Sequence, residues 1–154
     1  MKYTVDDIDI YIMTHNRADY LMLSIESLLN QSAGVSKITV LDNESTDNTL
    51  SAVERFSSRG VRYIRTKGFL GNFKKAQEIA SGKYVMLFHD DDILHPLYLE
   101  LALQVLNEKD DISLITTRYT EFFDDDFPGM PESIVPDYYY FEKQKDFASH
   151  MYFL

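Results

Sequence analysis

Short apolar runs alternate along this chain with longer stretches in which apolar residues recur every three or four positions. The runs cover residues 8–14, 38–41, 61–64, 84–88 and 112–116. Short, bounded runs of apolar and β-branched residues are typical of strands that are covered by helices. The sequence therefore predicts five strands.

The intervals between the runs have helical spacing. Gly34 and Gly60 follow the first two of these helices and end the apolar pattern there. Ser45 or Thr46 can cap the second helix, and Pro96 suits the first position of the fourth. The predicted apolar faces consist of Leu21, Ile25, Leu28 and Leu29 in the first helix, Leu50, Val53 and Phe56 in the second, Phe73, Ala76 and Ala80 in the third, and Leu99, Ala102, Leu103 and Leu106 in the fourth.

The alternation of strands and helices determines the predicted architecture. Strands recur roughly every 25 residues with a helix between them, which is the spacing that right-handed crossovers between parallel strands require. The predicted fold class is α/β, a three-layer α/β/α sandwich with a mostly parallel central sheet. The unbroken apolar run at residues 84–88 indicates a strand that is buried on both faces, so we expect it in the centre of the sheet.

Three consecutive aspartates, Asp90, Asp91 and Asp92, follow this expected central strand. Adjacent carboxylates repel one another and stay ionised together only where a cation or hydrogen-bond donors compensate them. Ligands of parallel sheets bind in the loops just past the carboxyl ends of the strands. A positively charged group is therefore expected at the aspartates.

Other polar loops are predicted to meet these aspartates at the same edge of the sheet. Residues 14–17 follow the first strand, Asp42 follows the second, and a glycine-containing turn at residues 67–72 follows the third. The carboxyl ends of parallel strands lie along one edge, so four loops face one crevice. Carboxylate oxygens hold Mg²⁺ or Mn²⁺ well when substrate phosphates complete the coordination shell. The sequence therefore predicts a nucleoside diphosphate that is bound through Mg²⁺ or Mn²⁺.

The composition limits the class of protein. The chain has 154 residues, enough for one domain with a sizeable core, and 45% of them are hydrophobic. Its 15 basic and 25 acidic residues give a net charge of −10, which argues against nucleic-acid binding. There is no cysteine, which excludes disulfides and thiolate chemistry. No stretch approaches the ~20 apolar residues of a membrane span, and the chain start lacks a signal-peptide core, so a cytoplasmic location is predicted.

The pattern of strands and helices decays after the fifth predicted strand. Residues 122–136 contain three prolines and a second acidic run, 124–126, and are interpreted as a long solvated loop. Residues 138–154 are rich in Tyr and Phe, which we expect to pack against protein or to contact an acceptor sugar or a membrane surface. Two regions are therefore predicted: an α/β core at 1–118, and the start of a second region at 119–154 that we interpret as truncated.

Three motifs occur in order along the predicted core. They read Ile-Tyr-Ile-Met-Thr-His-Asn-Arg at 10–17, Val-Leu-Asp-Asn-Glu-Ser-Thr-Asp-Asn-Thr at 40–49, and Ala-Ser-Gly-Lys-Tyr-Val at 80–85, which leads into His-Asp-Asp-Asp-Ile-Leu at 89–94. In this order and at these intervals the motifs resemble the family 2 glycosyltransferases of the GT-A fold. The resemblance implies a nucleotide-sugar donor-binding core at 1–118 and the start of the acceptor side at 119–154.

The resemblance also implies an activity. Such a protein is an inverting transferase that uses Mg²⁺ or Mn²⁺ to move a sugar from a nucleotide-sugar donor to a glycan or lipid-linked acceptor. Surface polysaccharide synthesis is the process in which we expect it, with peripheral membrane association left open. The catalytic base of the family is a carboxylate downstream of the aspartates, and its expected position lies beyond Leu154.

Site residues follow from the resemblance, position by position. Those implied to line the nucleotide pocket are Thr14, His15, Asn16 and Arg17. Asp42 is implied to hydrogen-bond the base and Asp90 to contact the ribose. Asp91 is the implied metal ligand, with Asp92 as the other candidate. Lys67 is the candidate for the basic residue that often follows the third strand of the family.

Rival functions from other classes stay open. Asp90 and Asp92 fit the Asp-x-Asp pattern of a Mg²⁺-dependent phosphatase of the haloacid-dehalogenase type, with Asp90 as nucleophile, although that family carries its motif on an early strand. A non-catalytic nucleotide-binding fragment is the second rival. A calcium loop does not fit, because His95 stands where the sharp turn needs Gly. Simple structural roles are an Asx-turn for Asp42 and a helix N-cap for Asp92.

Overall fold

The computed structural model describes residues 2–68, 70–109, 111–117 and 120–123. The chain divides into two compact units, Met1–Tyr119 and Thr120–Leu154, and all helices and strands described belong to the first. In chain order they are η1 (Val5–Asp7), β1 (Ile8–Thr14), α1 (Ala18–Leu29), β2 (Ile38–Asn43), α2 (Thr49–Glu54), η2 (Ser57–Arg59), β3 (Val61–Thr66), α3 (Gly71–Ile79), β4 (Tyr84–His89) and α4 (Tyr98–Glu108). Among these helices, none has the length and apolar character needed to span a membrane.

The four described strands form a parallel sheet in the order β3-β2-β1-β4. β1 lies between β2 and β4, and its residue Ile12 pairs with Val40 on one side and with Phe88 on the other. Successive residues of a strand point to opposite faces of the sheet. Ile12 accordingly belongs to one buried apolar cluster, and its neighbour Tyr11 belongs to another.

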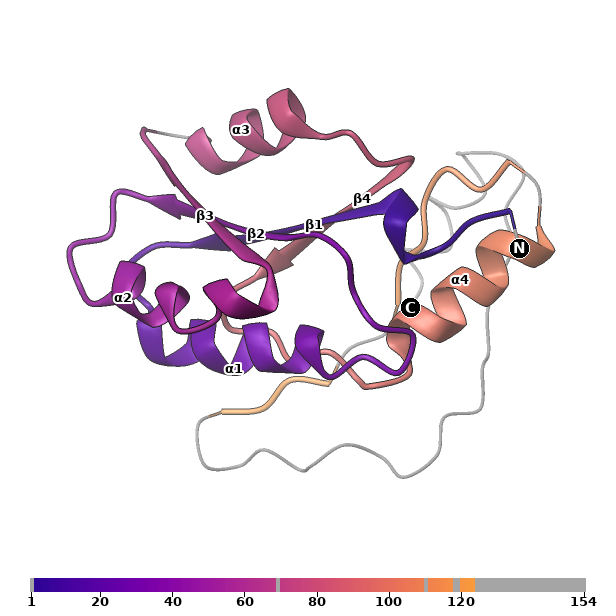
Figure 1. The fold of residues 1–154 in the computed structure, drawn as a ribbon, viewed down its shortest axis with the longest axis horizontal. Helices are drawn as coiled ribbons and strands as arrows, with labels where there is room; N and C mark the ends of the chain where they lie inside the picture. Colours follow the sequence, from indigo (N-terminus) through magenta and orange to yellow (C-terminus); the bar gives the residue numbers. More distant parts are fainter. Residues whose placement is uncertain (1, 69, 110, 118–119, 124–154) are drawn as a thin grey trace. The chain divides into compact units, whose positions relative to one another are not determined.

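Helices cover both faces of the sheet, with α1, α2 and α4 on one side and α3 on the other (Figure 1). The larger core cluster lies on the first side and joins the apolar stripes of α1 and α4 to β1. Leu21 and Ile25 in this cluster are fully buried, and each such side chain contributes about 2 kcal/mol through burial. The smaller cluster contains Tyr11, Leu41 and Ala76 and lies beneath α3. The predicted three-layer α/β/α sandwich is therefore confirmed.

β4 does not lie in the centre of this sheet, so the prediction for residues 84–88 is wrong in this respect. Within the described part of the chain, β4 pairs with β1 alone and forms an edge. Val85 and Leu87 are 45% and 44% exposed, because α3 packs mainly on β2 and β3 and leaves these two side chains open to solvent. An apolar run has the same pattern in a central strand and in an edge strand, so the sequence alone does not distinguish the two positions.

The fifth predicted strand is not present among the described residues. Residues 112–117 form no helix or strand, although the Tyr84 hydroxyl donates a hydrogen bond to the Ile112 carbonyl oxygen (3.1 Å). A short apolar run indicates burial but does not supply a strand to pair with, and pairing defines a strand in a sheet.

Helix starts differ from the prediction in two places. The second predicted helix consists of α2 and η2, and the Asp47 carboxylate, rather than a hydroxyl of residues 45–46, accepts the hydrogen bond of the Thr49 amide (3.1 Å). α4 starts after Pro96 instead of at it. Asp92 is consequently too far from this helix to be its N-cap.

A buried carboxylate ties the start of β1 to the turn before β4. Asp9 is 3% exposed, and its Oδ2 accepts hydrogen bonds from the amides of Ser81 (2.6 Å) and Gly82 (2.7 Å). Lys37 Nζ lies 3.2 Å from the other oxygen. A β-carbon at Gly82 would lie 2.8 Å from the Asp7 carbonyl oxygen, so only glycine permits this approach. Burial opposes ionisation of Asp9, but the two amides and Lys37 outweigh it and lower the pKa of the carboxyl to about 2.

We predict that Asp9→Asn lowers the free energy of unfolding by about 2 kcal/mol at neutral pH. A carboxyl whose pKa is lower in the folded than in the unfolded state stabilises the protein above the unfolded pKa, and this contribution is lost as the pH falls from about 4 to about 2. Urea titrations of wild type and variant should therefore converge toward acid pH. A difference that stays constant over the whole pH range contradicts the prediction, and Asp6→Asn at an exposed site is the control.

Candidate functional site

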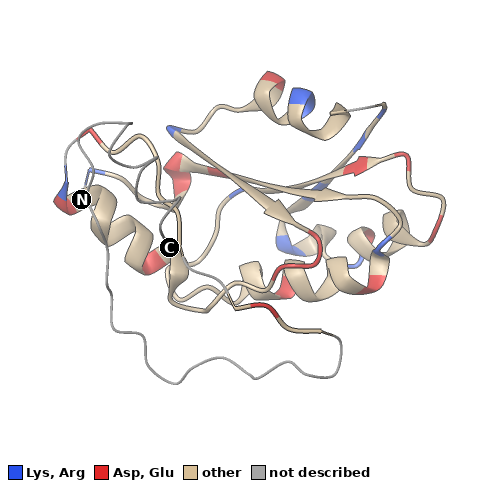
Figure 2. Cartoon of the chain, turned by 180° about the vertical axis from the view of Figure 1, so that it is seen from behind, with Lys and Arg blue, Asp and Glu red and all other residues tan. Residues whose placement is uncertain are grey.

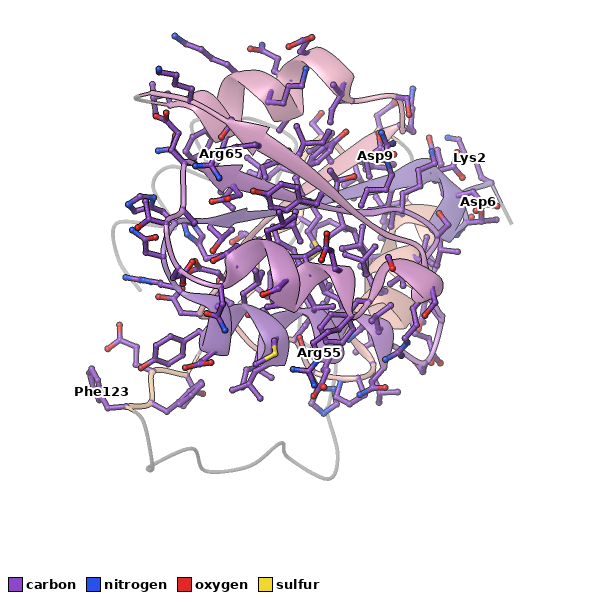
Figure 3. All side chains as sticks on the ribbon, turned by 60° about the vertical axis from the view of Figure 1, so that its left-hand side comes forward. Lys2, Asp6, Asp9, Arg55, Arg65 and Phe123 are labelled. Carbon is purple, nitrogen blue, oxygen red and sulfur yellow. The ribbon has the colours of Figure 1, made fainter. Side chains whose placement is uncertain are left out.

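The strand ends bring a row of polar side chains to the carboxyl edge of the sheet. The register places Thr14 of β1 beside Asp42 of β2, and Asp42 beside Arg65 of β3. Asp90, directly after β4, joins the row because the Thr14 hydroxyl donates a 2.7 Å hydrogen bond to its carboxylate. Arg65 and Asp9 mark the two opposite ends of the sheet in Figure 3. The loops after β1, β2 and β4 therefore meet at one edge, as the sequence indicates.

Arg17 supplies the positive charge that the three consecutive aspartates require. Its Nη1 forms a short ion pair with Asp91 and lies 3.5 Å from Oδ1 of Asp90. The side chain of Asp90 is 5% exposed, whereas those of Arg17 and Asp91 are 51% and 47% exposed. Asp90, and then Asp91, raises the pKa of the Arg17 guanidinium above its usual range. The negative charge of the acidic loop is thus compensated by a side chain of the protein itself, and this side chain is accessible to solvent.

Ser24 of α1 fixes the backbone of the acidic loop. Its hydroxyl lies 2.8 Å from the carbonyl oxygen of Asp90 and 2.6 Å from that of Asp92. Desolvation raises the pKa of the Asp92 carboxyl, the charge of His89 opposes this shift, and the carboxylate of Asp91 adds to it. Of the two predicted metal ligands, Asp92 therefore holds its proton to a higher pH than an ordinary aspartate does.

The donor set at the loop fits a cation that arrives together with phosphate. Among the residues that the structure describes, no three His, Asp or Glu side chains gather in a way that could hold a metal ion. Asp91 offers an exposed carboxylate, and Asp92 follows it in the chain. Mg²⁺ and Mn²⁺ sites with one or two carboxylates are completed by substrate phosphates and water. The residues therefore fit this kind of shared site and not a cage formed by protein alone.

Asp42 faces the interior of the protein. It is 1% exposed, and one of its oxygens accepts hydrogen bonds from the Ser45 amide (3.0 Å) and hydroxyl, while the Tyr63 hydroxyl donates to the other. Burial raises the pKa of the Tyr63 hydroxyl, and so does its hydrogen bond to Asp42, which keeps this group a donor at neutral pH. An Asx-turn, the simple structural role expected for Asp42, would use the amide two residues on, whereas Asp42 bonds the Ser45 amide, three residues on. Its contact with a nucleotide base stays a prediction.

Asn16 and Asp47 lock the loops after β1 and β2 together. The Asn16 side-chain oxygen accepts a hydrogen bond from the Thr46 amide (2.7 Å) and lies 3.4 Å from the Asp47 amide nitrogen. The Asp47 carboxylate accepts a hydrogen bond from the Ala18 amide (3.2 Å) at the start of α1. Asn16 has a φ of 54°, in the left-handed region that Asn tolerates better than most residues. The polar side chain of Asn16 thus holds the two loops together at the carboxyl edge of the sheet.

His15 and Lys67, the remaining predicted nucleotide contacts, lie at the surface of this edge. The His15 ring donates from Nδ1 to the Asn43 carbonyl oxygen (2.6 Å), and the residue is exposed. The Lys67 side chain is 85% exposed, and its Nζ lies 3.8 Å from the Glu44 carboxylate. Acidic residues follow β2 and β4 along this edge, and the cartoon in Figure 2 is coloured red at these positions.

Arg65 is a basic residue at this edge that the sequence analysis did not single out. Its Nη2 donates to the Ser45 carbonyl oxygen (3.1 Å), and its Nη1 lies 3.9 Å from the Asp42 carboxylate. The signal that could have found it is its position, because it directly follows the predicted third strand just as Asp42 follows the second. In the structure, β3 extends to Thr66 and Arg65 lies in register with Asp42.

The carboxyl edge is an open rim in the described part of the chain. A hollow of about 160 Å³ lies beside Arg17 at the start of α1, smaller than the about 300 Å³ at the lower end of small-molecule sites. A hollow of about 340 Å³ lies at the opposite edge of the sheet, between Tyr3, Tyr84 and Asp111. The larger hollow is therefore not the one that the predicted ligand residues border.

The fold and this edge define a class of protein: an α/β protein whose parallel sheet carries acidic and basic loops at its carboxyl edge, where phosphorylated ligands of such sheets bind. Comparison with known families identifies the Glycosyl transferase family 2 domain over residues 9–153. The chain belongs to glycosyl transferase family 2, as the motifs indicate.

Curated relatives match most of this chain. An uncharacterized glycosyltransferase of Haemophilus influenzae is 30% identical over 69% of the chain and 34% of its own length. The chondroitin synthase of Pasteurella multocida is 30% identical over 72% of the chain and 12% of its own length. The UDP-Glc:alpha-D-GlcNAc-diphosphoundecaprenol beta-1,3-glucosyltransferase WfgD of Escherichia coli is 28% identical over 73% and 45%. The chain thus spans less than half the length of each of these relatives.

Solved structures share the fold. Staphylococcus aureus TarS in complex with UDP superposes with a TM-score of 0.59 and 24% identity, over 66% of this chain and 32% of that one. The mannosyltransferase PcManGT of Pyrobaculum calidifontis, in complex with GDP-Man and Mn²⁺, superposes with a TM-score of 0.56 and 23% identity, over 67% and 32%. This likeness confirms the predicted GT-A type of fold.

We predict that Asn16→Ala lowers the free energy of unfolding by about 2 kcal/mol, because it leaves the Thr46 amide without its acceptor and puts at positive φ a residue that tolerates this region less well than asparagine does. Asn16→Gly removes the same acceptor but relieves the backbone strain, so it should lose about 1 kcal/mol. Urea unfolding of the three proteins separates the two effects. If the alanine variant is as stable as wild type, the side-chain hydrogen bonds of Asn16 contribute nothing.

Proposed function

We propose that this chain forms the donor-binding part of an inverting, metal-dependent glycosyltransferase. It takes a nucleotide-diphosphate sugar and serves a glycan or lipid-linked acceptor in the synthesis of a surface polysaccharide. The observation that carries the proposal is the pairing of the exposed Asp91 carboxylate with Arg17 at the carboxyl edge of a family 2 chain. One edge then offers a carboxylate to a divalent cation and a guanidinium to phosphate oxygens.

Asp91 is the proposed ligand of Mg²⁺ or Mn²⁺, with Asp92 beside it. The cation, when bound, neutralises the diphosphate and so favours its departure from the sugar. The bond from Thr14 to Asp90 and the bonds from Ser24 to the loop backbone hold the segment that presents Asp91. The structure of PcManGT with GDP-Man and Mn²⁺ supports a divalent cation for the family fold.

The proposed nucleotide contacts divide into two groups. His15, Arg17 and Lys67 have exposed side chains that can reach a ligand directly. Thr14, Asp42 and Asp90 are buried, and Asn16, although exposed, bonds the Thr46 amide; these four residues hold the loops in position. We infer that this second group shapes the edge to which the first group brings the donor.

The proposed acceptor is supported by the names of relatives, the proposed base follows from the resemblance of the motifs, and neither is taken from the described residues. The relatives include a chondroitin synthase and a transferase named for a diphosphoundecaprenol-linked sugar, which supports a glycan or lipid-linked acceptor. A carboxylate on the acceptor side, beyond Leu154, stays the predicted base. A non-catalytic nucleotide-binding role would preserve donor binding, so sugar transfer by a chain that includes the acceptor side distinguishes the two.

Calorimetric titration of the chain with UDP, GDP and dTDP should show binding to at least one of them that requires Mn²⁺. Asp91→Asn should weaken this binding at least about tenfold, since the loss of a group that supports a bound metal commonly costs this much. Glu54→Gln removes an exposed carboxylate at the end of α2 and should bind as wild type does. Binding of equal strength without a divalent cation would remove the basis of the proposal.

The phosphatase alternative requires a covalent aspartyl-phosphate on Asp90. We expect none to form, because Asp90 is 4% exposed and its two oxygens face the Thr14 hydroxyl and Arg17. Incubation with p-nitrophenyl phosphate and Mg²⁺, followed by mass spectrometry of the intact protein, should find no phosphate adduct. An adduct mapped to Asp90 would favour the phosphatase.

A further inference from the structure

The ion pair between Arg17 and Asp91 is exposed to solvent on both sides. Arg17 also reaches Asp90, which is held by the buried hydrogen bond from Thr14. The other basic side chains that the structure describes at this edge have partners elsewhere: Arg65 with Asp42 and Lys67 with Glu44. Within the described residues, the ion pairs to the acidic loop thus come from Arg17.

Arg17 and a divalent cation would compete for the same carboxylate, that of Asp91, whose Oδ2 contacts Nη1 of Arg17. A cation bound to Asp91 would lie next to the guanidinium, and two positive groups at this distance repel one another. The pair between Arg17 and Asp91 is half exposed, and exposed ion pairs contribute at most about 1 kcal/mol. Replacing the guanidinium by a divalent cation at Asp91 therefore costs little free energy.

We propose that Arg17 is a built-in counter-ion that exchanges partners when the donor binds. Without donor it neutralises Asp91; when a divalent cation and a diphosphate arrive, the cation takes the carboxylate and the guanidinium turns to the phosphate oxygens. This inference rests on the proposed function, and it assigns to Arg17 a role in the unbound state that metal binding has to reverse. In the unbound state Arg17 therefore positions Asp91, and it contacts the ligand only once the donor has bound.

The backbone around Arg17 is suited to such an exchange. Its carbonyl oxygen accepts the Leu21 amide (3.0 Å) in the first turn of α1, and the next amide, that of Ala18, is held by Asp47. Beyond this fixed backbone the long side chain extends to a half-exposed guanidinium. Only side-chain torsions have to change for the guanidinium to leave Asp91, while Asp90 stays bonded to Thr14.

A purely structural ion pair makes the opposite prediction for metal binding. If Arg17 only held the loop in shape, its removal would loosen Asp91 and weaken the binding of Mn²⁺ and of nucleotide alike. If Arg17 competes with the metal, its removal tightens the binding of Mn²⁺ alone and weakens that of the nucleotide. The signs of the two changes therefore separate the models.

The first experiment measures the weak Mn²⁺ binding that the carboxylates of the 154-residue chain provide without nucleotide, by electron paramagnetic resonance of the free ion. Arg17→Gln should bind Mn²⁺ about two- to fivefold tighter than wild type, which is the range that the loss of an exposed competing ion pair allows. Arg17→Lys should fall between the two, and Arg59→Gln at an exposed site should change nothing. The gain should vanish when Asp91→Asn is added, because the competition takes place at that carboxylate.

The second experiment measures UDP and GDP binding at saturating Mn²⁺. Arg17→Gln should weaken the binding of whichever diphosphate wild type binds by about tenfold, because a charge-assisted bond to phosphate is lost. If wild type shows metal-dependent nucleotide binding but Arg17→Gln binds Mn²⁺ no tighter, the partner exchange is refuted and the proposed function stands. If wild type binds neither diphosphate, the proposed function fails and this inference fails with it.

Discussion

Three adjacent carboxylates can follow β4 because the neighbouring segment of the chain supplies the groups that hold them. The Thr14 hydroxyl bonds to Asp90, the Arg17 guanidinium pairs with Asp91, and the Ser24 hydroxyl bonds to the loop backbone. All three groups belong to the segment that runs from the end of β1 into α1, and β1 pairs in parallel with β4. The strand order therefore makes the acidic loop possible, since another neighbour for β4 would leave like charges without compensation.

The carboxylates of this chain differ in how rigidly they are compensated, and this difference decides what each can do. Asp9 and Asp42 are buried among fixed donors, amides and a tyrosine hydroxyl among them. Taking either away from these donors would leave buried groups unsatisfied, at a cost of about 1–3 kcal/mol for each lost bond. Asp91 has a solvent-exposed partner on a long side chain. In the proposed function, ligand binding therefore falls to Asp91, the carboxylate that is easiest to release.

The order of strands and helices and the edge where the polar loops meet could be predicted, because both follow from apolar periodicity and from the geometry of parallel strands. The exposure of Val85 could not, since it depends on where α3 packs on the sheet. The need for a positive charge at the aspartates also followed from the sequence, but its source in Arg17 did not. Pairs such as Asp9 with Ser81 could not be predicted either. Like the pair of Arg17 with Asp91, they join residues far apart in the chain and exist only after folding.

An arginine suits both states of this edge for a geometric reason. Arg17 contacts Asp90 and Asp91 through one nitrogen, Nη1, and the five N–H donors of a planar guanidinium also allow it to bind two oxygens of a phosphate. A lysine ammonium is a compact, strongly hydrated charge that lacks this fork. Since the Arg17 backbone is fixed in the first turn of α1, the guanidinium can pass from carboxylate to phosphate by rotation of its side chain. The exchange of partners then needs no movement of the sheet or of the helices that build the edge.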